Sequence, residues 1–390
     1  MLTASIKRYA PLLSVLSSGL LLLGCASGET PGAAPEPSAA PPPAAEDPQD
    51  DSSEAEQPAG GSGERNEIEM IVPANFGSAA NYVALEYGYW SDRGLDVALS
   101  TLDTGSEISA AVRAGEAEFG GISLASSIPP ASAAGIPVRG VALYMNDATF
   151  VNKVSRMALL AHPNSGVDPE DPATLRGKSI GLTEGSTSER YTLLYLEANG
   201  IGVDEVELVN LPVPDMPVSL QQQLTDVVAP WEPFTSQILL EQEDTIVVER
   251  GGTYGADILA ISGLEETVVQ RPEVVEALIL GLFEATQDVR QDPAGAAEIA
   301  STYVPGIEPD VATSAIENHD YDPRVSVCTV EGVLQAANEL IEFGTVEKDG
   351  EFVEEDIMLL DTVRELQEDP ENQQYFEDLP PLPETVDDCN

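Results

Sequence analysis

Hydroxyl and acidic side chains in the segment 183–189 could bind a small ligand. Ser186 and Glu189 are spaced as in a capping box, S-x-x-E, which by itself would explain both residues. The first N–H groups of the helix that would begin here also suit a ligand oxygen or an anion. Glu184 and Glu189 would oppose an anion. Glu184, Ser186 and Thr187 are candidates for ligand contact, with helix capping as the alternative for this segment.

Five further residues are candidates for the same binding site. Ser106 and Ser123 each follow a predicted strand, either as helix N-caps or as ligand contacts. Phe76 could stack on a flat ligand or belong to the core. Trp231 follows another strand, as a core or a pocket residue, and Glu232 could accept a hydrogen bond from an amino or ring N–H group. We therefore predict a site that binds its ligand without covalent chemistry.

The sequence contains no pattern typical of a catalytic or metal site. His162 and His319 are isolated, and there is no Ser-His-Asp spacing, Cys-His pair or cluster of metal ligands. Neither a cofactor nor a metal is therefore expected. Arg139, Arg156 and Arg190 lie outside the candidate loops and are interpreted as surface ion pairs rather than as ligands of an anion.

The N-terminus has the pattern of a secreted lipoprotein. A short basic region precedes the apolar run Pro11–Leu23, whose length is typical of a signal-peptide core and short for a membrane span. The run ends in Leu22-Leu23-Gly24-Cys25, which resembles the bacterial lipobox. The resemblance implies that residues 1–24 are a signal peptide and that Cys25 is lipidated; an ordinary signal peptide with a chance cysteine is the alternative. The protein is then expected outside the cytoplasmic membrane, anchored to its outer face through Cys25.

Composition separates a tether from a folded body. Residues 25–66 are rich in Pro, Ala, Gly, Ser and acids and contain no Val, Ile, Leu or aromatic side chain, so a solvated spacer is expected. Residues 67–390 carry 59 acidic and 14 basic side chains, a net charge of −45. This charge excludes nucleic acid as a partner, since binding to phosphates needs a basic surface.

Two cysteines, Cys328 and Cys389, lie in the predicted body. In an oxidising location such a pair is expected to form a disulfide, which would hold the C-terminal tail against the body. Two free thiols are the alternative.

Short apolar runs rich in β-formers alternate with helical patterns along the body, which predicts an α/β fold of βαβ units. Two sets of strands, at 68–145 and 157–248, are followed by helices that begin at Pro272, Pro293 and Pro309, and this order suggests two lobes with a cleft. Ligands of open parallel sheets lie beyond the carboxyl ends of the strands. The site is therefore expected at four loops: Ala74–Ser78, Asp103–Ser106, Ser123–Ser127 and Thr183–Ser188.

Six segments of the body resemble, in the same order, the motifs of an extracytoplasmic solute-binding family of ABC importers. This family takes up nitrate, alkanesulfonates, taurine and pyrimidine precursors of thiamine. Each match is weak alone, but six in the family's order are specific. The segments are Asn81–Val97, Ala111–Gly120, Ala134–Val138, Leu175–Gly181, Asp226–Phe234 and Gln270–Val275.

The resemblance implies a two-lobed periplasmic-binding-protein fold of type II, with parallel or mixed sheets flanked by helices and a ligand cleft between the lobes. Residues 67–150 and 252–390 would form lobe 1, and residues 151–251 would form lobe 2. In the family, the segment around Trp231 lines the pocket.

The resemblance also implies a function. The protein would be a receptor, not an enzyme, that delivers a small molecule to an ABC permease and its ATPase, and we expect it to be a monomer. The alternatives are a sensory ligand-binding protein or an enzyme on the same fold, either a dehydratase or a pyrimidine synthase.

Among the family's solutes, the sequence favours a neutral or cationic nitrogen-bearing heterocycle over a small hard anion. The four candidate loops and the segment Trp231-Glu232-Pro233 contain Glu184 and Glu232 but no Lys or Arg. An anion buried beside two carboxylates would be destabilised, whereas a heterocycle could donate to Glu232 and stack on Trp231.

Overall fold

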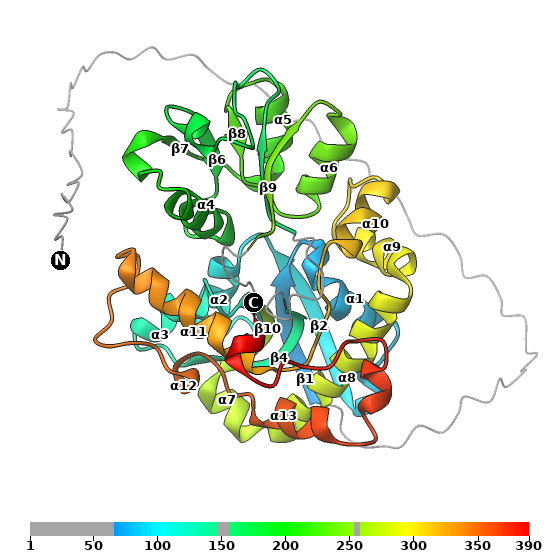
Figure 1. Ribbon diagram of the computed structural model, residues 1–390. Helices are drawn as coiled ribbons and strands as arrows, with labels where there is room; N and C mark the ends of the chain where they lie inside the picture. The colour runs from blue at the N-terminus through cyan, green and yellow to red at the C-terminus, as the bar shows by residue number, and fades with distance from the viewer. Residues whose placement is uncertain (1–65, 147–155, 253–257, 390) are drawn as a thin grey trace, which may run out of the picture. The chain divides into compact units, whose positions relative to one another are not determined.

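The computed structural model describes residues 66–146, 156–252 and 258–389. The predicted signal peptide, the predicted lipidation site Cys25 and nearly all of the predicted tether lie outside these residues. Figure 1 shows two β-sheets flanked by helices in the part that is described. Within that part, no helix has the length and the apolar content that a bilayer span requires.

The first sheet has five strands in the order β2-β1-β3-β10-β4. β1 pairs in parallel with β2 and β3, and β10 runs antiparallel to both of its neighbours. Every residue of β3 is buried, as expected for an inner strand, whereas β2 at the edge exposes several side chains. The strands are β1 (Asn66–Pro73), β2 (Leu95–Leu102), β3 (Phe119–Ser123), β4 (Val138–Asn146) and β10 (Ile258–Leu264).

Strand β10 has no counterpart among the strands predicted from the sequence. Its first six residues are buried, so it lacks the alternation of apolar and polar residues that marks a half-exposed strand. It lies between β3 and β4 although the second sheet separates it from them along the chain. The first sheet is therefore assembled from two separate stretches of sequence.

The second sheet has the order β7-β6-β8-β5-β9. β6 pairs in parallel with β7 and β8, whereas β5 runs antiparallel to β8 and β9. Both sheets are therefore mixed, and the start of β5 lies at the same edge as the ends of β6 and β8. The strands are β5 (Ala158–Ala161), β6 (Ser179–Leu182), β7 (Glu207–Asn210), β8 (Val227–Val228) and β9 (Ile246–Arg250), and their helices are α4 (Thr187–Ala198), α5 (Met216–Gln221) and α6 (Phe234–Glu241).

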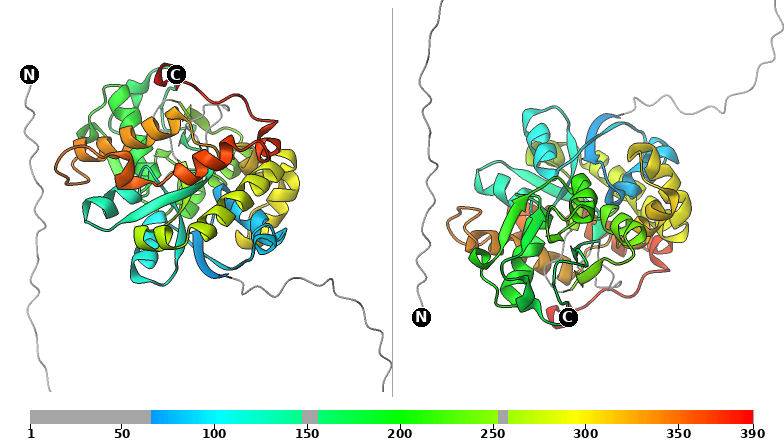
Figure 2. Two further views of the ribbon diagram at one scale, coloured as in Figure 1. Left: turned by 90° about the horizontal axis from the view of Figure 1, so that it is seen from below. Right: turned by 90° about the horizontal axis from the view of Figure 1, so that it is seen from above.

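Helices that follow β10 pack around the first sheet (Figure 1 and Figure 2, left). Three of them begin at a proline, as predicted, because proline lacks the N–H group that a first helical turn leaves without an intrahelical acceptor. These are α8 (Pro272–Gln291), α9 (Pro293–Tyr303) and α10 (Pro309–Glu317). The helices α7 (Glu265–Gln270), α11 (Val327–Glu342), α12 (Glu354–Ile357) and α13 (Asp361–Glu368) also follow β10. The helices between the strands β1 to β4 are α1 (Ala79–Glu86), α2 (Gly105–Ala114) and α3 (Ile128–Ala133).

A disulfide joins Cys328 and Cys389, as the sequence predicts, with the Cα atoms 5.4 Å apart. Cys328 lies in the first turn of α11 and belongs to the core of the first sheet. The bond closes a loop that contains α12 and α13. It therefore fixes the end of the described chain to the body.

A buried ion pair fixes the loop between α10 and α11. The carboxylate of Asp322, which is 0% exposed, accepts hydrogen bonds from Arg324 Nε at 2.9 Å and Nη2 at 2.8 Å. The guanidinium of Arg324 also lies 5.7 Å from the ring centre of Phe376. From the end of β4, Asn146 donates to the Arg324 carbonyl at 2.9 Å, so the pair is tied to the first sheet.

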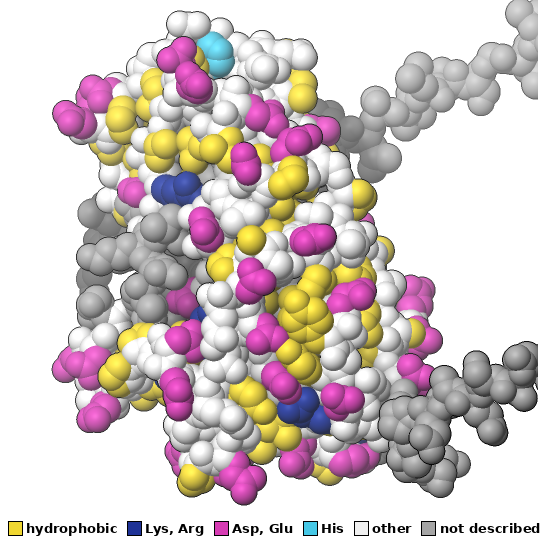
Figure 3. Space-filling view, turned by 90° about the vertical axis from the view of Figure 1, so that its right-hand side faces the viewer, with side chains coloured by type: hydrophobic (Ala, Val, Ile, Leu, Met, Phe, Trp, Pro, Cys, Tyr) yellow, Lys and Arg dark blue, Asp and Glu magenta, His cyan; other side chains and the backbone are white. Residues whose placement is uncertain are grey.

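Acidic side chains are scattered over the face shown in Figure 3, where few Lys or Arg side chains appear. Several of the described arginines pair with acids, for example Arg93 with Glu284 at 3.0 Å and Arg271 with Glu118 at 2.7 Å. On this face the acidic side chains that give the body its negative charge are spread over the surface.

Candidate functional site

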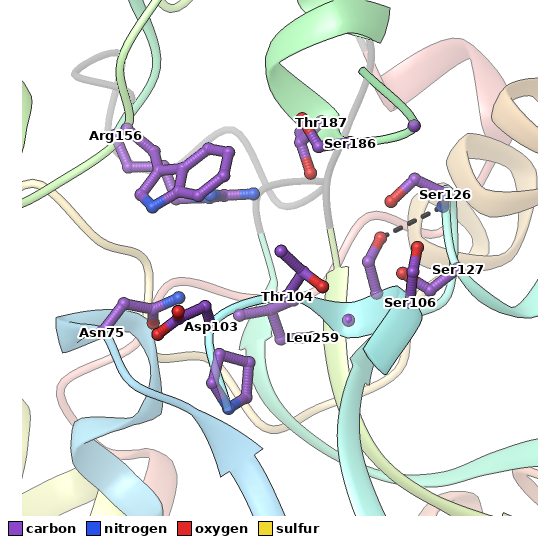
Figure 4. Close-up of a pocket in the computed structure, with 15 residues that line it drawn as sticks. Asn75, Asp103, Thr104, Ser106, Ser126, Ser127, Arg156, Ser186, Thr187 and Leu259 are labelled. Atoms are coloured by element: carbon purple, nitrogen blue, oxygen red, sulfur yellow. Dashed lines mark hydrogen bonds between the residues drawn. The ribbon is translucent and has the colours of Figure 1, made fainter. Parts of the chain in front are cut away.

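A pocket lies at the carboxyl ends of strands from both sheets (Figure 4). Each of the four loops predicted to form the site contributes at least one residue to its lining. The first sheet and its loops contribute Pro73, Asn75, Asp103, Thr104, Gly105, Ser106, Ser123, Ser126, Ser127 and Leu259, and the second sheet and its loops contribute Arg156, Gly185, Ser186, Thr187 and Trp231.

The N-terminus of α2 forms one side of the pocket. Thr104 is its N-cap, and a capping box joins the Glu107 N–H to Thr104 Oγ1 at 3.3 Å and the Thr104 N–H to Glu107 Oε2 at 3.0 Å. Ser106 therefore lines the pocket from the first turn of the helix and is not the cap that the sequence allowed. A Cβ atom on Gly105 would lie 2.5 Å from Ser127 Oγ, so glycine permits α2 to start directly against the next loop.

Ser123 ends β3 and organises the turn that follows it. Its Oγ accepts hydrogen bonds from the N–H groups of Ala125 at 3.2 Å and Ser126 at 3.1 Å. Ser123 thus caps a turn rather than a helix. The turn places Ser126 and Ser127 along the pocket beside Ser106 (Figure 4).

The N-terminus of α4 faces the pocket from the second sheet. Ser186 is its N-cap: the Oγ atom accepts from the Ser188 N–H at 3.1 Å and donates to the Thr183 carbonyl at 2.6 Å. The Glu189 carboxylate accepts from the Gly185 N–H at 2.7 Å, one residue earlier than in a capping box. Ser186 and Thr187 both line the pocket, whereas Glu184 is exposed and outside the lining.

Arg156 and Trp231 complete the second-sheet side of the pocket. Trp231 forms a β-bridge with Met157, and the Glu232 N–H donates to the Arg156 carbonyl at 3.1 Å, so the two segments run side by side. Arg156 is 5% exposed. The prediction that Arg156 lies at the surface is therefore wrong. Antiparallel β5 brings its N-terminal side to the ligand edge of the sheet.

Phe76 lies in the core and not in the pocket. Its side chain is fully buried in the core of the first sheet, and its carbonyl accepts a hydrogen bond from the Tyr321 hydroxyl at 2.6 Å. Of the two roles that the sequence left open, the core role is the one found. Asn75, its neighbour, lines the pocket instead.

Glu232 is also buried beneath the pocket rather than in its lining. Its carboxylate, 0% exposed, accepts from Arg250 Nη2 at 2.6 Å, from the Ser236 N–H at 2.9 Å and from Ser236 Oγ at 3.0 Å. Burial raises the pKa of Glu232 to about 7, although Arg250 and Ser236 act in the opposite direction. A ligand in the pocket has no direct access to this carboxylate.

We expect the Glu232→Gln variant to reveal the raised pKa as a pH dependence of stability. An acid whose folded pKa exceeds its unfolded value stabilises the fold fully below the unfolded pKa of 4.5, and this contribution is lost as the pH rises through about 7. The free energy of unfolding of the wild type, relative to the variant, should fall by up to about 3 kcal/mol between about pH 4.5 and pH 8. Urea unfolding of both proteins across this range measures the difference, and parallel pH profiles would contradict the prediction.

The pocket has the character of a binding site for an oxygen-rich ligand. Its lining, as far as the structure describes it, contains the buried guanidinium of Arg156, the starts of two helices and five serines. The first N–H groups of a helix lack acceptors within it and carry partial positive charge. Asp103 is the one carboxylate among the lining residues that the structure describes, and it lies near Asn75 (Figure 4).

His319 is not among the residues that line the pocket. His319 is buried and its Nδ1 lies 2.6 Å from the Ala315 carbonyl, and burial together with the charge of Arg156 lowers its pKa to about 3. Among the described residues no group of three or more His, Cys, Asp or Glu side chains could hold a metal ion.

Comparisons with known proteins agree with this geometry. The family model described as "NMT1/THI5 like" matches residues 75–296. A binding protein of Brucella abortus is 22% identical over 254 residues, which are 63% of this chain and 75% of that protein. The alkanesulfonate-binding protein from Xanthomonas axonopodis pv. citri, solved with bound MOPS, has a TM-score of 0.62 at 16% identity and covers 74% of this chain and 96% of its own.

A second solved structure shows the same architecture. The periplasmic nitrate-binding protein from Synechocystis has a TM-score of 0.62 at 14% identity, with 84% of this chain and 91% of that chain covered. The chain therefore has the periplasmic-binding-protein fold, and these relatives are binding proteins rather than enzymes. Because the family model spans more than half of the sequence, the chain belongs to the NMT1/THI5-like family.

Proposed function

We propose that this protein is the solute-binding subunit of an ABC importer, which captures a small molecule and delivers it to a membrane permease. The observation that carries the proposal is that one pocket is lined by strand ends and helix starts of both sheets. A ligand that contacts both sides stabilises the arrangement in which they are close, and this is how capture becomes a conformational signal.

In this proposal the two sheets are the centres of two lobes, with residues 67–150 and 252–390 in lobe 1 and residues 151–251 in lobe 2. The grouping is supported by the strand orders, because β10 pairs with β3 and β4 in the first sheet whereas β5 to β9 form the second sheet. The protein acts as a monomer and uses no cofactor.

We propose an organic oxyanion, such as a sulfonate, as the ligand class. Arg156 supplies a buried positive charge, and the starts of α2 and α4 supply N–H groups and hydroxyls around it. The nitrogen heterocycle favoured by the sequence depended on Phe76, Trp231 and Glu232. Trp231 lines the pocket, but Phe76 and Glu232 do not. Sulfonate and nitrate are also the solutes in the names of the structural relatives.

Titration of the mature protein with an alkanesulfonate, taurine, nitrate and an aminopyrimidine tests this function. We expect at least one of the oxyanions to bind in calorimetry and to raise the melting temperature, since a ligand that binds only the folded state stabilises it. Binding of the pyrimidine alone would overturn the ligand class. If no solute from this set or from cell extract raised the melting temperature, the receptor function would be wrong.

We further propose that Cys25 is lipidated and anchors the protein to the outer face of the cell membrane. The support is the lipobox-like sequence Leu22-Leu23-Gly24-Cys25 and the proline-rich stretch after it. In cells fed a labelled fatty acid, the wild type should be labelled and found with membranes, and Cys25→Ser should remain unlabelled. A wild type that is released without label would leave the protein a freely secreted receptor.

A further inference from the structure

A buried ion pair joins the two sheets beside the pocket. Arg190 Nη2 on α4 lies 2.6 Å from Glu339 Oε2 on α11, and the two side chains are 4% and 16% exposed. α4 belongs to the second sheet, whereas α11 packs into the core of the first sheet through Val333, Ala337 and Leu340. The pair is therefore a direct electrostatic link between the two halves of the site.

The same helix carries the pocket residues and the arginine. Arg190 follows Ser186 and Thr187 by about one turn, so the three side chains share one side of α4. The Arg190 N–H donates to the Ser186 carbonyl at 3.2 Å, which fixes this turn. A movement that withdraws Ser186 and Thr187 from the first sheet also separates Arg190 from Glu339.

Glu339 is held in place from the side of the first sheet. Gln335 Nε2, one turn earlier on α11, lies 3.0 Å from Glu339 Oε1. The start of α11 is fixed by the Ser326 N-cap and by the disulfide of Cys328. The acid therefore presents a fixed acceptor, and Arg190 reaches it only when α4 is close.

The Arg190–Glu339 ion pair is buried, so its contribution to stability depends on whether the two sheets are close together. Burial lowers the pKa of Arg190, and the charge of Glu339 acts against that shift. A buried charge that loses its partner is strongly destabilised, whereas two charges that separate into water are not. The pair therefore stabilises the arrangement with the sheets close together and contributes little once they part.

We propose that Arg190 and Glu339 are a positioning pair that holds the ligand-binding arrangement of the two sheets and thereby sets how firmly the ligand is retained. This inference rests on the proposed function. Glu339 does not line the pocket, so the pair acts through α4. Its loss reduces the fraction of protein in the binding arrangement, and the apparent affinity falls by the same factor.

The Glu339→Gln variant tests the proposal with the whole mature protein. Affinity for the sulfonate that binds the wild type should fall about 5- to 100-fold, mainly through faster dissociation. Glu342→Gln is the matched control, because Glu342 is exposed on the same helix and makes the same change of charge. Equal affinities of the wild type and Glu339→Gln would overturn the proposal.

A double-mutant cycle tests whether Arg190 and Glu339 affect affinity through each other or independently. If the side chains act through each other, the variant with both Arg190→Gln and Glu339→Gln binds no more weakly than Arg190→Gln alone. Additive losses of affinity would overturn the positioning role. The Glu339→Gln arm keeps the test valid even if Arg190→Gln fails to fold, since Glu339 lies nearer the surface.

Small-angle scattering gives a readout that needs no ligand. The ligand-free Glu339→Gln variant should have a larger radius of gyration than the wild type, because fewer molecules hold the sheets together. Identical scattering curves would count against the pair as a link between the sheets. If no test solute binds the wild type, the proposed ligand class fails while this measurement still decides on the pair.

Discussion

The Arg156→Gln variant is expected to lose most of its affinity for an organic oxyanion, by about 2 kcal/mol or more, which is roughly 30-fold. Among the described residues that line the pocket, Arg156 is the one Lys or Arg side chain, and it is buried. Glutamine keeps hydrogen-bond donors but removes the charge, so a buried anion would face only dipoles. Calorimetry with the best-binding sulfonate measures the difference.

Arg176→Gln is the matched control for this experiment. Arg176 belongs to the same sheet region but lies at the surface, where it pairs with Glu205 at 2.8 Å with both side chains 41% exposed. The control removes the same charge from the protein, so it corrects for any long-range effect of the net charge. If both variants bind the sulfonate as the wild type does, the oxyanion is not held by Arg156, and the role proposed for this residue is wrong.

The second large effect concerns stability. Asp322→Ala should lower the free energy of unfolding by about 3–5 kcal/mol, because it leaves the Arg324 guanidinium buried without its acid. The variant also removes the acceptor of the Arg324 N–H, which lies 2.9 Å from Asp322 Oδ1. The loop between α10 and α11 would then keep the hydrogen bond from Asn146 to the Arg324 carbonyl but lose the ion pair that fixes it. Urea unfolding followed by circular dichroism measures the change.

Asp361→Ala provides the comparison for the Asp322 result. Asp361 also pairs with an arginine, Arg364 at 3.3 Å, but its side chain is 95% exposed. Exposed pairs contribute little, so a change below about 1 kcal/mol is expected. Similar effects of the two substitutions would show that burial is not what makes the Asp322 pair important.

The strands and the loops that form the pocket could largely be predicted, because local patterns determine them. Apolar runs separated by glycine and proline gave most of the strands, and Pro272 correctly marked a helix start. The rule that ligands lie at the carboxyl ends of strands placed four loops at the pocket. A missed signal was also local: Thr104 and Glu107 form the T-x-x-E pattern of a capping box, which identifies the true N-cap of α2.

Arg156 and Glu232 could not be placed in the same way, because their positions depend on strand direction. With β5 parallel, Arg156 would lie at the far edge of the sheet; antiparallel pairing with β8 brings it beside Trp231. Glu232 follows β8, as Trp231 does, but its side chain is buried and pairs with Arg250 on β9, 18 residues further along the chain. No spacing rule relates these residues until the pairing of the strands is known.

The position of β10 has a consequence for how the chain is made. A chain leaving the ribosome or the translocon presents β3 and β4 long before β10 exists, so the two strands have no shared neighbour during that interval. The strands of the second sheet, β5 to β9, come from one continuous stretch. They can therefore pair before the rest of the chain has been synthesised. The first sheet therefore has the greater need of a holding chaperone, since unpaired strand edges invite aggregation until the last segment arrives.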